Sequence, residues 1–237
     1  MRSTKSQALF EYCHRTSIEF TTLDYYGHGE SSGGEDERKE KGTRIEDHQL
    51  KKGTISRWTD DVLAILDNVT CSPKQIIVGS SMGLWIMIIA ALSRIDRIGG
   101  LVGIGAAPDF TDLMSKQIYT DPELSKQMHL HGYCDIPTTY DASGLYRIYK
   151  ELLVDGQKNF LLNGGDNSIS LFGQDNDNPL VLIHEKKDVD ISWKYSEKLL
   201  QIINCKEKKL ILVDDGDHRL SSSDDLDIII NVIEELV

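Results

Sequence analysis

Several features that mark particular protein classes are scarce in this chain of 237 residues. Its four cysteines (Cys13, Cys71, Cys134 and Cys205) lie far apart and form no CxxC pair. We therefore expect the cysteines to be reduced thiols, as in an intracellular protein, and we expect no disulfide framework. No apolar run approaches the ~18 residues that a membrane-spanning helix needs. Only five residues are proline and 40% are hydrophobic, which indicates an ordered globular protein.

Basic residues are also in short supply, with 26 lysines and arginines against 38 acidic residues and a net charge of −12. Neither a nucleic-acid partner nor an anionic membrane surface is expected for such a chain. Its length suits one large domain. The first 17 residues contain Arg2, Lys5 and Arg15 and so weakly resemble a mitochondrial presequence, but Glu11 and the apolar spacing favour a short amphipathic helix over residues 3–14.

The next segments indicate a strand, a loop and an insertion. Alternation over residues 17–23 predicts a strand, and the glycine-rich residues 24–33 predict a loop at its carboxyl end. No helix follows these glycines, so they do not form a dinucleotide-binding fingerprint. Residues 35–52 interleave six acidic with six basic residues, which predicts a solvated insertion.

The remaining chain alternates short apolar runs with helical patterns, which predicts a mostly parallel sheet flanked by helices. The stretch 106–178 is too long for a crossover, and we expect it to form a cap over a core made of residues 1–105 and 179–237. The cap contains helical patterns at 124–129 and 145–153. The strands are expected at 75–78, 98–105, 180–184 and 210–213, and the core helices at about 56–66, 82–91, 192–203 and 224–236.

One motif lies between the first of these apolar runs and the helix after it. Residues Gly79-Ser80-Ser81-Met82-Gly83 read G-x-S-x-G in a strand-turn-helix setting. Such a turn holds the central serine in a strained conformation with its hydroxyl exposed, and the helix N-terminus supplies free N–H groups beside it. An ordinary glycine-rich turn would also fit the pentapeptide alone. The motif makes Ser81 a candidate nucleophile and the N–H of Met82 a candidate oxyanion donor.

A serine nucleophile needs a base, and the base needs an acid to orient it. The expected chain order for this motif is Ser, then Asp or Glu, then His. Asp188 is the first aspartate after the run 180–184, with Asp190 as the alternative, and His218 follows the run that ends at Val213. Loops at one edge of a parallel sheet converge, so we expect Ser81, Asp188 and His218 to meet.

His129 and His131 form an H-x-H pair with no further ligands nearby in the sequence. A satisfied or exposed role suits them better than metal binding. No metal site is predicted.

At this point the chain resembles the palmitoyl-protein thioesterase and acyl-glucuronide esterase branch of the α/β-hydrolase family. The resemblance implies an α/β-hydrolase fold, with Ser81 as nucleophile, Asp188 as acid, His218 as base and no cofactor. It also implies substrates that are acylated proteins or small acyl esters or thioesters. The segments that carry it are residues 79–85, 24–33, 217–219, 137–140 and 184–193.

The same resemblance bears on the compartment and on the start of the chain. It implies a mitochondrial protein, or a cytosolic one if no transit peptide lies upstream. Residues 1–13 resemble the helix after the third strand, so the first strands and the loop that carries half of the oxyanion hole are expected to be absent. This expectation raises a second hypothesis, a non-catalytic binding or scaffold protein. The sequence gives no indication of oligomeric state.

Overall fold

The computed structural model describes residues 3–31, 53–138, 144–164, 168–173, 177–214 and 218–237. The chain forms two compact units. The first unit contains residues 1–23, 62–108 and 161–237, and the second contains residues 24–61 and 109–160. The predicted charged insertion, 35–52, lies outside the described residues. In the structure, residues 161–178 group with the first unit. The cap predicted at 106–178 stays a prediction.

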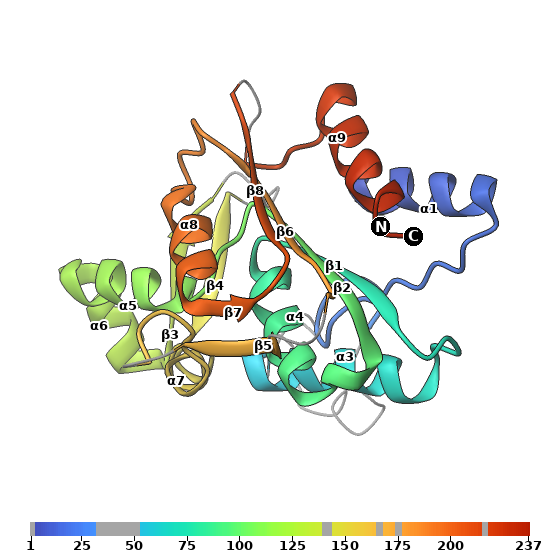
Figure 1. The fold of residues 1–237 in the computed structure, drawn as a ribbon. Helices are drawn as coiled ribbons and strands as arrows, with labels where there is room; N and C mark the ends of the chain where they lie inside the picture. Colours follow the sequence, from blue (N-terminus) through green and yellow to red (C-terminus); the bar gives the residue numbers. More distant parts are fainter. Residues whose placement is uncertain (1–2, 32–52, 139–143, 165–167, 174–176, 215–217) are drawn as a thin grey trace. The chain divides into compact units, whose positions relative to one another are not determined.

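The first unit is built on a parallel sheet with the strand order β1-β2-β6-β8 (Figure 1). Each neighbouring pair is parallel. The four apolar runs predicted as strands are therefore confirmed, and β6 is buried along its whole length. A second, two-stranded parallel sheet pairs β5 with β7. The strands are β1 (Gln75–Ser80), β2 (Ile98–Ile104), β5 (Ile169–Gly173), β6 (Leu180–Glu185), β7 (Ile203–Cys205) and β8 (Lys208–Val213).

Helices cover both faces of the four-stranded sheet. On one face α1 (Thr4–Thr16) and α9 (Ser223–Glu234) pack together over Val102 and Ile104 of β2 and Val181 and Ile183 of β6 (Figure 1). The alternate side chains of β6 point to the other face, which α4 (Met82–Ser93) and α8 (Lys194–Ile202) cover. These helices confirm the predicted ones, and the short 3-10 helix η2 (Ile95–Arg97) leads from α4 into β2.

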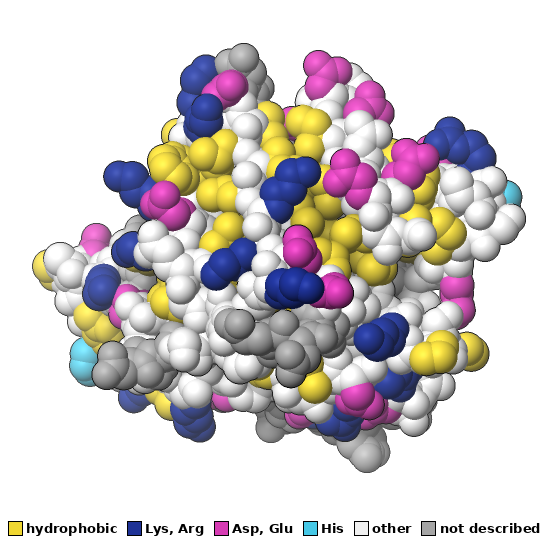
Figure 2. All heavy atoms as spheres, in the orientation of Figure 1, with side chains coloured by type: hydrophobic (Ala, Val, Ile, Leu, Met, Phe, Trp, Pro, Cys, Tyr) yellow, Lys and Arg dark blue, Asp and Glu magenta, His cyan; other side chains and the backbone are white. Residues whose placement is uncertain are grey.

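Burial explains the character of these helices. Eight residues of α4 are buried, so this helix is apolar on every side. By contrast, α9 is amphipathic and begins with a capping box, in which Ser222 accepts from the N–H of Asp225 and the Asp225 carboxylate accepts from the N–H of Ser222. The face of the sheet beneath α9 is not fully covered, since Ile211 and Val213 of β8 and Leu226 of α9 are only partly buried. Figure 2 shows apolar side chains gathered over these two elements.

The strand predicted at residues 17–23 is wrong. These residues follow α1 without regular secondary structure, although Ile18 and Phe20 do pack against the core as their alternation suggests. A strand exists only where its backbone groups pair with a neighbouring strand. Within the described residues, no strand pairs with this segment.

The second unit holds a helix pair and a hairpin around its own core of Ile118, Met128, Cys134, Ile148 and Leu153. The helix predicted at 124–129 is confirmed, whereas the one predicted at 145–153 begins only at Lys150. Residues 145–149 instead pair antiparallel with Tyr133–Pro137, a strand partner that the apolar spacing of this segment does not reveal. Its elements are α5 (Phe110–Thr120), α6 (Pro122–His131), β3 (Tyr133–Pro137), β4 (Leu145–Tyr149) and α7 (Lys150–Lys158).

Residues 24–31 form the predicted loop and belong to this second unit. Asp24 accepts from the N–H of Glu30, and Asp61 accepts from the N–H of Tyr26. The indole N–H of Trp58 donates to the carbonyl of Tyr26. Asp61 and Trp58 lie on α3 (Ile55–Asn68), which confirms the helix expected at 56–66 and continues into the first unit. Among the described helices, none has both the length and the apolar character to cross a membrane.

Candidate active site

Ser81 stands at the turn between β1 and α4, in the first unit. Its backbone has φ 54° and ψ −121°, a conformation that residues other than glycine rarely adopt. The predicted strained turn is thus confirmed. Strand and helix pass so closely here that a Cβ atom on Gly79 would lie 2.6 Å from the Leu84 backbone nitrogen. Glycine is therefore required at residue 79.

The backbone around Ser81 is fixed at both ends. Its N–H donates to the carbonyl of Ile104 at the end of β2 (2.8 Å), and its carbonyl accepts from the N–H of Leu84 (3.1 Å). Met82 is the first residue of α4, so its N–H has no partner within the helix. In the described part of the chain this N–H makes no hydrogen bond. Its role as an oxyanion donor stays a prediction.

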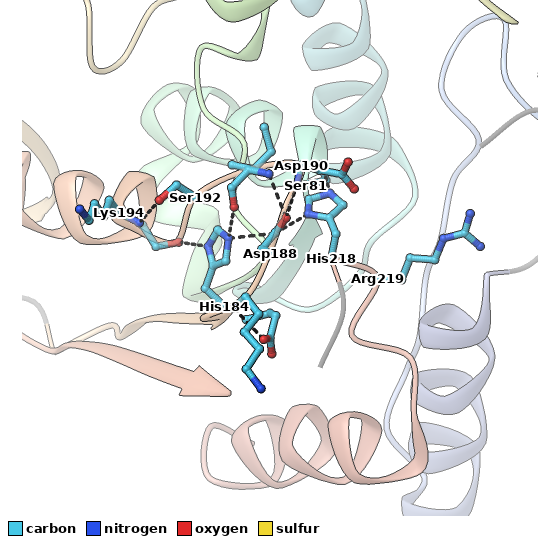
Figure 3. Close-up of polar contacts among 12 residues, drawn as sticks. Ser81, His184, Asp188, Asp190, Ser192, Lys194, His218 and Arg219 are labelled. Carbon is cyan, nitrogen blue, oxygen red and sulfur yellow. Dashed lines mark hydrogen bonds and ion pairs between the residues drawn. The ribbon is translucent and has the colours of Figure 1, made fainter. Parts of the chain in front are cut away.

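The structure brings the three predicted side chains together (Figure 3). The Nε2 atom of His218 lies 3.2 Å from Ser81 Oγ, and its Nδ1 atom lies 2.6 Å from Asp188 Oδ2. Ser81 follows β1, Asp188 follows β6 and His218 follows β8, so all three lie beyond carboxyl ends of parallel strands. Asp188 is completely buried as a side chain, and His218 is 13% exposed.

The hydrogen bonds fix the protonation pattern of this chain of groups. The Oδ1 atom of Asp188 accepts from the backbone N–H groups of Asp190 and Ile191, each at 2.9 Å. Burial raises the pKa of Asp188, but the Ile191 N–H and the His218 hydrogen bond outweigh burial and keep the pKa below its usual value. An ionised carboxylate only accepts, so His218 carries its proton on Nδ1 and Nε2 is free to accept from Ser81.

Asp190, the alternative acid, is placed differently. Its backbone N–H supports Asp188, whereas its side chain is exposed. Together Asp188, Asp190 and His218 are the one group of the described residues whose ligand atoms, within 4.8 Å of one another, could hold a metal ion. An ion there would have to displace the hydrogen bond between Asp188 and His218, so we assign no metal to this group. In the H-x-H pair, the Nδ1 atom of His129 is hydrogen-bonded to the carbonyl of Ser125 on its own helix.

Sequence reasoning missed two residues of this site. His184, the fifth residue of β6, is fully buried and contacts Asp188, with its Nε2 atom 3.2 Å from Oδ2. Ser196 of α8, also fully buried, lies 2.7 Å from Nδ1 of His184. A signal was present, because a histidine within a buried apolar strand must find polar partners, and Asp188 follows four residues later.

Comparisons with known proteins agree with this fold. No protein-family model matches the chain. Mouse palmitoyl-protein thioesterase ABHD10, a mitochondrial protein, is 29% identical over 237 residues, which cover 100% of this chain and 71% of the mouse protein. The human protein of the same name is 27% identical, with 100% and 69% covered.

Solved structures give the same result. A putative hydrolase from Agrobacterium vitis S4 matches with a TM-score of 0.83 and 28% identity, over 99% of this chain and 82% of that one. The structure of mouse α/β-hydrolase domain-containing protein 10 matches with a TM-score of 0.78 and 29% identity, over 100% and 84%. The chain is therefore a hydrolase of the α/β-hydrolase fold, homologous along its whole length to palmitoyl-protein thioesterase ABHD10.

Proposed function

We propose that this protein is a serine hydrolase that cleaves acyl thioesters or esters, with Ser81 as nucleophile, His218 as general base and Asp188 as the acid that orients it. The observation that carries the proposal is the unbroken line of hydrogen bonds from Ser81 Oγ through His218 to Asp188. A serine hydroxyl is a weak nucleophile by itself, and a base within hydrogen-bond reach removes that limit.

In the first half of the reaction, Ser81 Oγ attacks the acyl carbonyl carbon while His218 Nε2 takes the hydroxyl proton. The resulting imidazolium is stabilised by Asp188, which is already ionised and bonded to Nδ1–H. Negative charge develops on the carbonyl oxygen, and the N–H of Met82 at the positive end of α4 is placed to bind it. Collapse breaks the bond to the leaving sulfur or oxygen, which receives the proton from His218.

In the second half, His218 removes a proton from water, and the hydroxide formed attacks the acyl-Ser81 carbonyl. Collapse of this second intermediate releases the carboxylic acid and returns the proton to Ser81 Oγ. The same three side chains serve both halves. No cofactor takes part in any of these steps.

The substrate class follows from the relatives. Since they are named palmitoyl-protein thioesterases and match over this whole chain, we extend acyl-thioester cleavage to it, with acylated proteins or small acyl esters and thioesters as substrates. Their names also call them mitochondrial, and we propose the same compartment for this protein. A fluorescent fusion to the native coding sequence tests the compartment. Cytosolic fluorescence would contradict it.

The nucleophile is tested with a fluorophosphonate probe, which labels activated serines covalently. We expect the purified wild-type chain to be labelled and to hydrolyse a p-nitrophenyl ester and palmitoyl-CoA. The Ser81→Ala variant should lose both properties, whereas Ser80→Ala, one residue away on the same turn, should keep labelling. A folded wild-type chain that binds acyl ligands but neither reacts nor turns over would favour the alternative, a non-catalytic binding or scaffold protein.

A further inference from the structure

His184 is a buried, titratable side chain for which the proposed reaction has no role. It lies near the end of β6 and is fully inaccessible to solvent. Its ring is held from both sides, with Nδ1 at 2.7 Å from Ser196 Oγ and Nε2 at 3.0 Å from the carbonyl oxygen of Ile191. Burying a polar ring is costly unless its atoms are hydrogen-bonded, and both nitrogens are.

These partners fix which nitrogen of His184 carries the proton. The carbonyl of Ile191 can only accept, so Nε2 must donate. In the neutral ring Nδ1 then accepts, and the hydroxyl of Ser196 donates to it. Burial lowers the pKa of His184, which favours this neutral form. The carbonyl of Ile191 therefore selects a tautomer whose N–H points at the loop that contains Asp188, and the Ser196 hydroxyl, which can donate or accept, satisfies Nδ1.

The same N–H reaches the carboxylate of Asp188. Nε2 lies 3.2 Å from Oδ2, the very oxygen that binds His218 at 2.6 Å. Figure 3 shows Asp188 between the two imidazoles. The single Nε2–H of His184 is shared between this carboxylate and the carbonyl of Ile191. With the two backbone donors on Oδ1 and His218 on Oδ2, the carboxylate is held through both of its oxygens.

We propose that His184 is a positioning residue for the reaction: held as the Nε2–H tautomer by the carbonyl of Ile191, with Ser196 on its other nitrogen, it fixes the Asp188 carboxylate in the orientation that His218 needs. The inference rests on the proposed function, because it acts only through Asp188. His184 is fully buried, and it bonds to Asp188 and not to Ser81. We therefore expect His184 to lower the free energy of the transition state, in which Asp188 must stabilise the imidazolium of His218.

The test compares two replacements of His184. His184→Phe keeps a ring but removes the donor, and we expect kcat and the rate of fluorophosphonate labelling to fall about 10- to 100-fold, as for loss of a hydrogen bond to a charged group. KM should change less than about twofold, because ground-state binding is untouched. His184→Gln keeps an N–H donor and should retain activity within about threefold. Leu199→Val, buried on α8 like Ser196, controls for lost stability.

A double-mutant cycle separates positioning from general support of the fold. If His184 acts through Asp188, then His184→Phe should cost less than about threefold in an Asp188→Asn background, since residues that act as a unit are not additive. An equal loss in both backgrounds would overturn the inference. Labelling that requires Ser81 but is unchanged in His184→Phe would overturn it alone, whereas labelling that persists in Ser81→Ala would overturn the proposed function with it.

A measurement on the wild-type chain covers the case in which His184→Phe does not fold. Nitrogen-15 NMR of labelled histidine distinguishes the two neutral tautomers. We expect His184 to be neutral with its proton on Nε2, and Ser196→Ala to keep this tautomer, since the carbonyl of Ile191 remains, but to lower kcat by several-fold because Nδ1 loses its partner. A proton on Nδ1 in the wild-type chain would overturn the inference, because Nε2 could then donate nothing to Asp188.

Discussion

Gly105 lies against the imidazole of His218. A Cβ atom at residue 105 would lie 3.6 Å from Cε1 and 3.7 Å from Nδ1 of the ring, and 3.3 Å from the carbonyl oxygen of His218. Gly105 has φ +56°, and its N–H donates to the carbonyl of Ile183. The backbone at the end of β2 therefore forms one wall of the space in which His218 is held.

We predict that Gly105→Ala lowers kcat by about 2- to 10-fold, because the 3.3 Å contact with the His218 carbonyl requires a shift of a few tenths of an ångström, and a full ångström costs about 100-fold. The left-handed backbone adds a stability cost of about 1–2 kcal/mol. Gly132→Ala is the matched control, since Gly132 has φ +74° with nothing within 4 Å of its added Cβ. Urea unfolding should give similar losses for both variants, and esterase assays should show a loss of turnover only for Gly105→Ala. Equal activity in the two would contradict a steric role for Gly105.

The parts of this fold that could be predicted from the sequence are those set by local pattern. The apolar runs at β2 and β6 indicate strands buried on both faces, and G-x-S-x-G marks the turn between β1 and α4. The meeting of Ser81, Asp188 and His218 could be predicted because carboxyl ends of parallel strands share one edge.

The features that could not be predicted depend on contacts distant in sequence. Residues 17–23 alternate as a strand does but have no strand partner among the described residues. Residues 145–149 are a strand because β3 pairs with them. The contact of His184 with Ser196 arises only when α8 packs on β6. Alternation reports which face a side chain takes, whereas pairing depends on tertiary structure.

The turn at Ser81 predicts a strict requirement for glycine at residue 79. The added methyl of Gly79→Ala would lie 2.6 Å from both the backbone nitrogen and Cα of Leu84, atoms that cannot move without shifting α4. We expect a loss of about 1–3 kcal/mol in the free energy of unfolding, the usual range for overpacking, and loss of fluorophosphonate labelling. Denaturant titration and labelling measure the two effects. Gly99→Ala, on β2, is the control that should keep labelling, because its added methyl would come no closer than 3.3 Å to any neighbouring atom.

The choice of acid is tested by two isosteric changes. Asp188→Asn keeps the shape of the side chain but removes its charge, so the preferred tautomer of His218 is lost. We expect kcat to fall by about 10⁴-fold, as in other Ser-His-Asp sites. Asp190→Asn retains the backbone N–H that supports Asp188 and should cost less than about threefold. Steady-state kinetics on both variants decides the matter, and a larger loss for Asp190→Asn would exchange their roles.

Stability should fall as the pH decreases, and His184 sets where the fall begins. Its pKa is lowered by burial in the folded state, so between the folded and unfolded values the unfolded chain binds the extra proton. The fall therefore starts near the ordinary histidine pKa of about 6.5 and continues below it. The pKa of Asp188 is also lowered, so its stabilisation is lost only in stronger acid, below about pH 4.

Urea midpoints measured at pH 7.5 and 5.5 isolate the histidine effect. We expect the midpoint to drop in the wild-type chain and to drop less in His184→Gln, which cannot titrate. His129→Gln, which replaces an exposed histidine, is the matched control. An equal drop in wild type and His184→Gln would mean that His184 becomes protonated in the folded protein as readily as in the unfolded chain, which its two occupied nitrogens argue against.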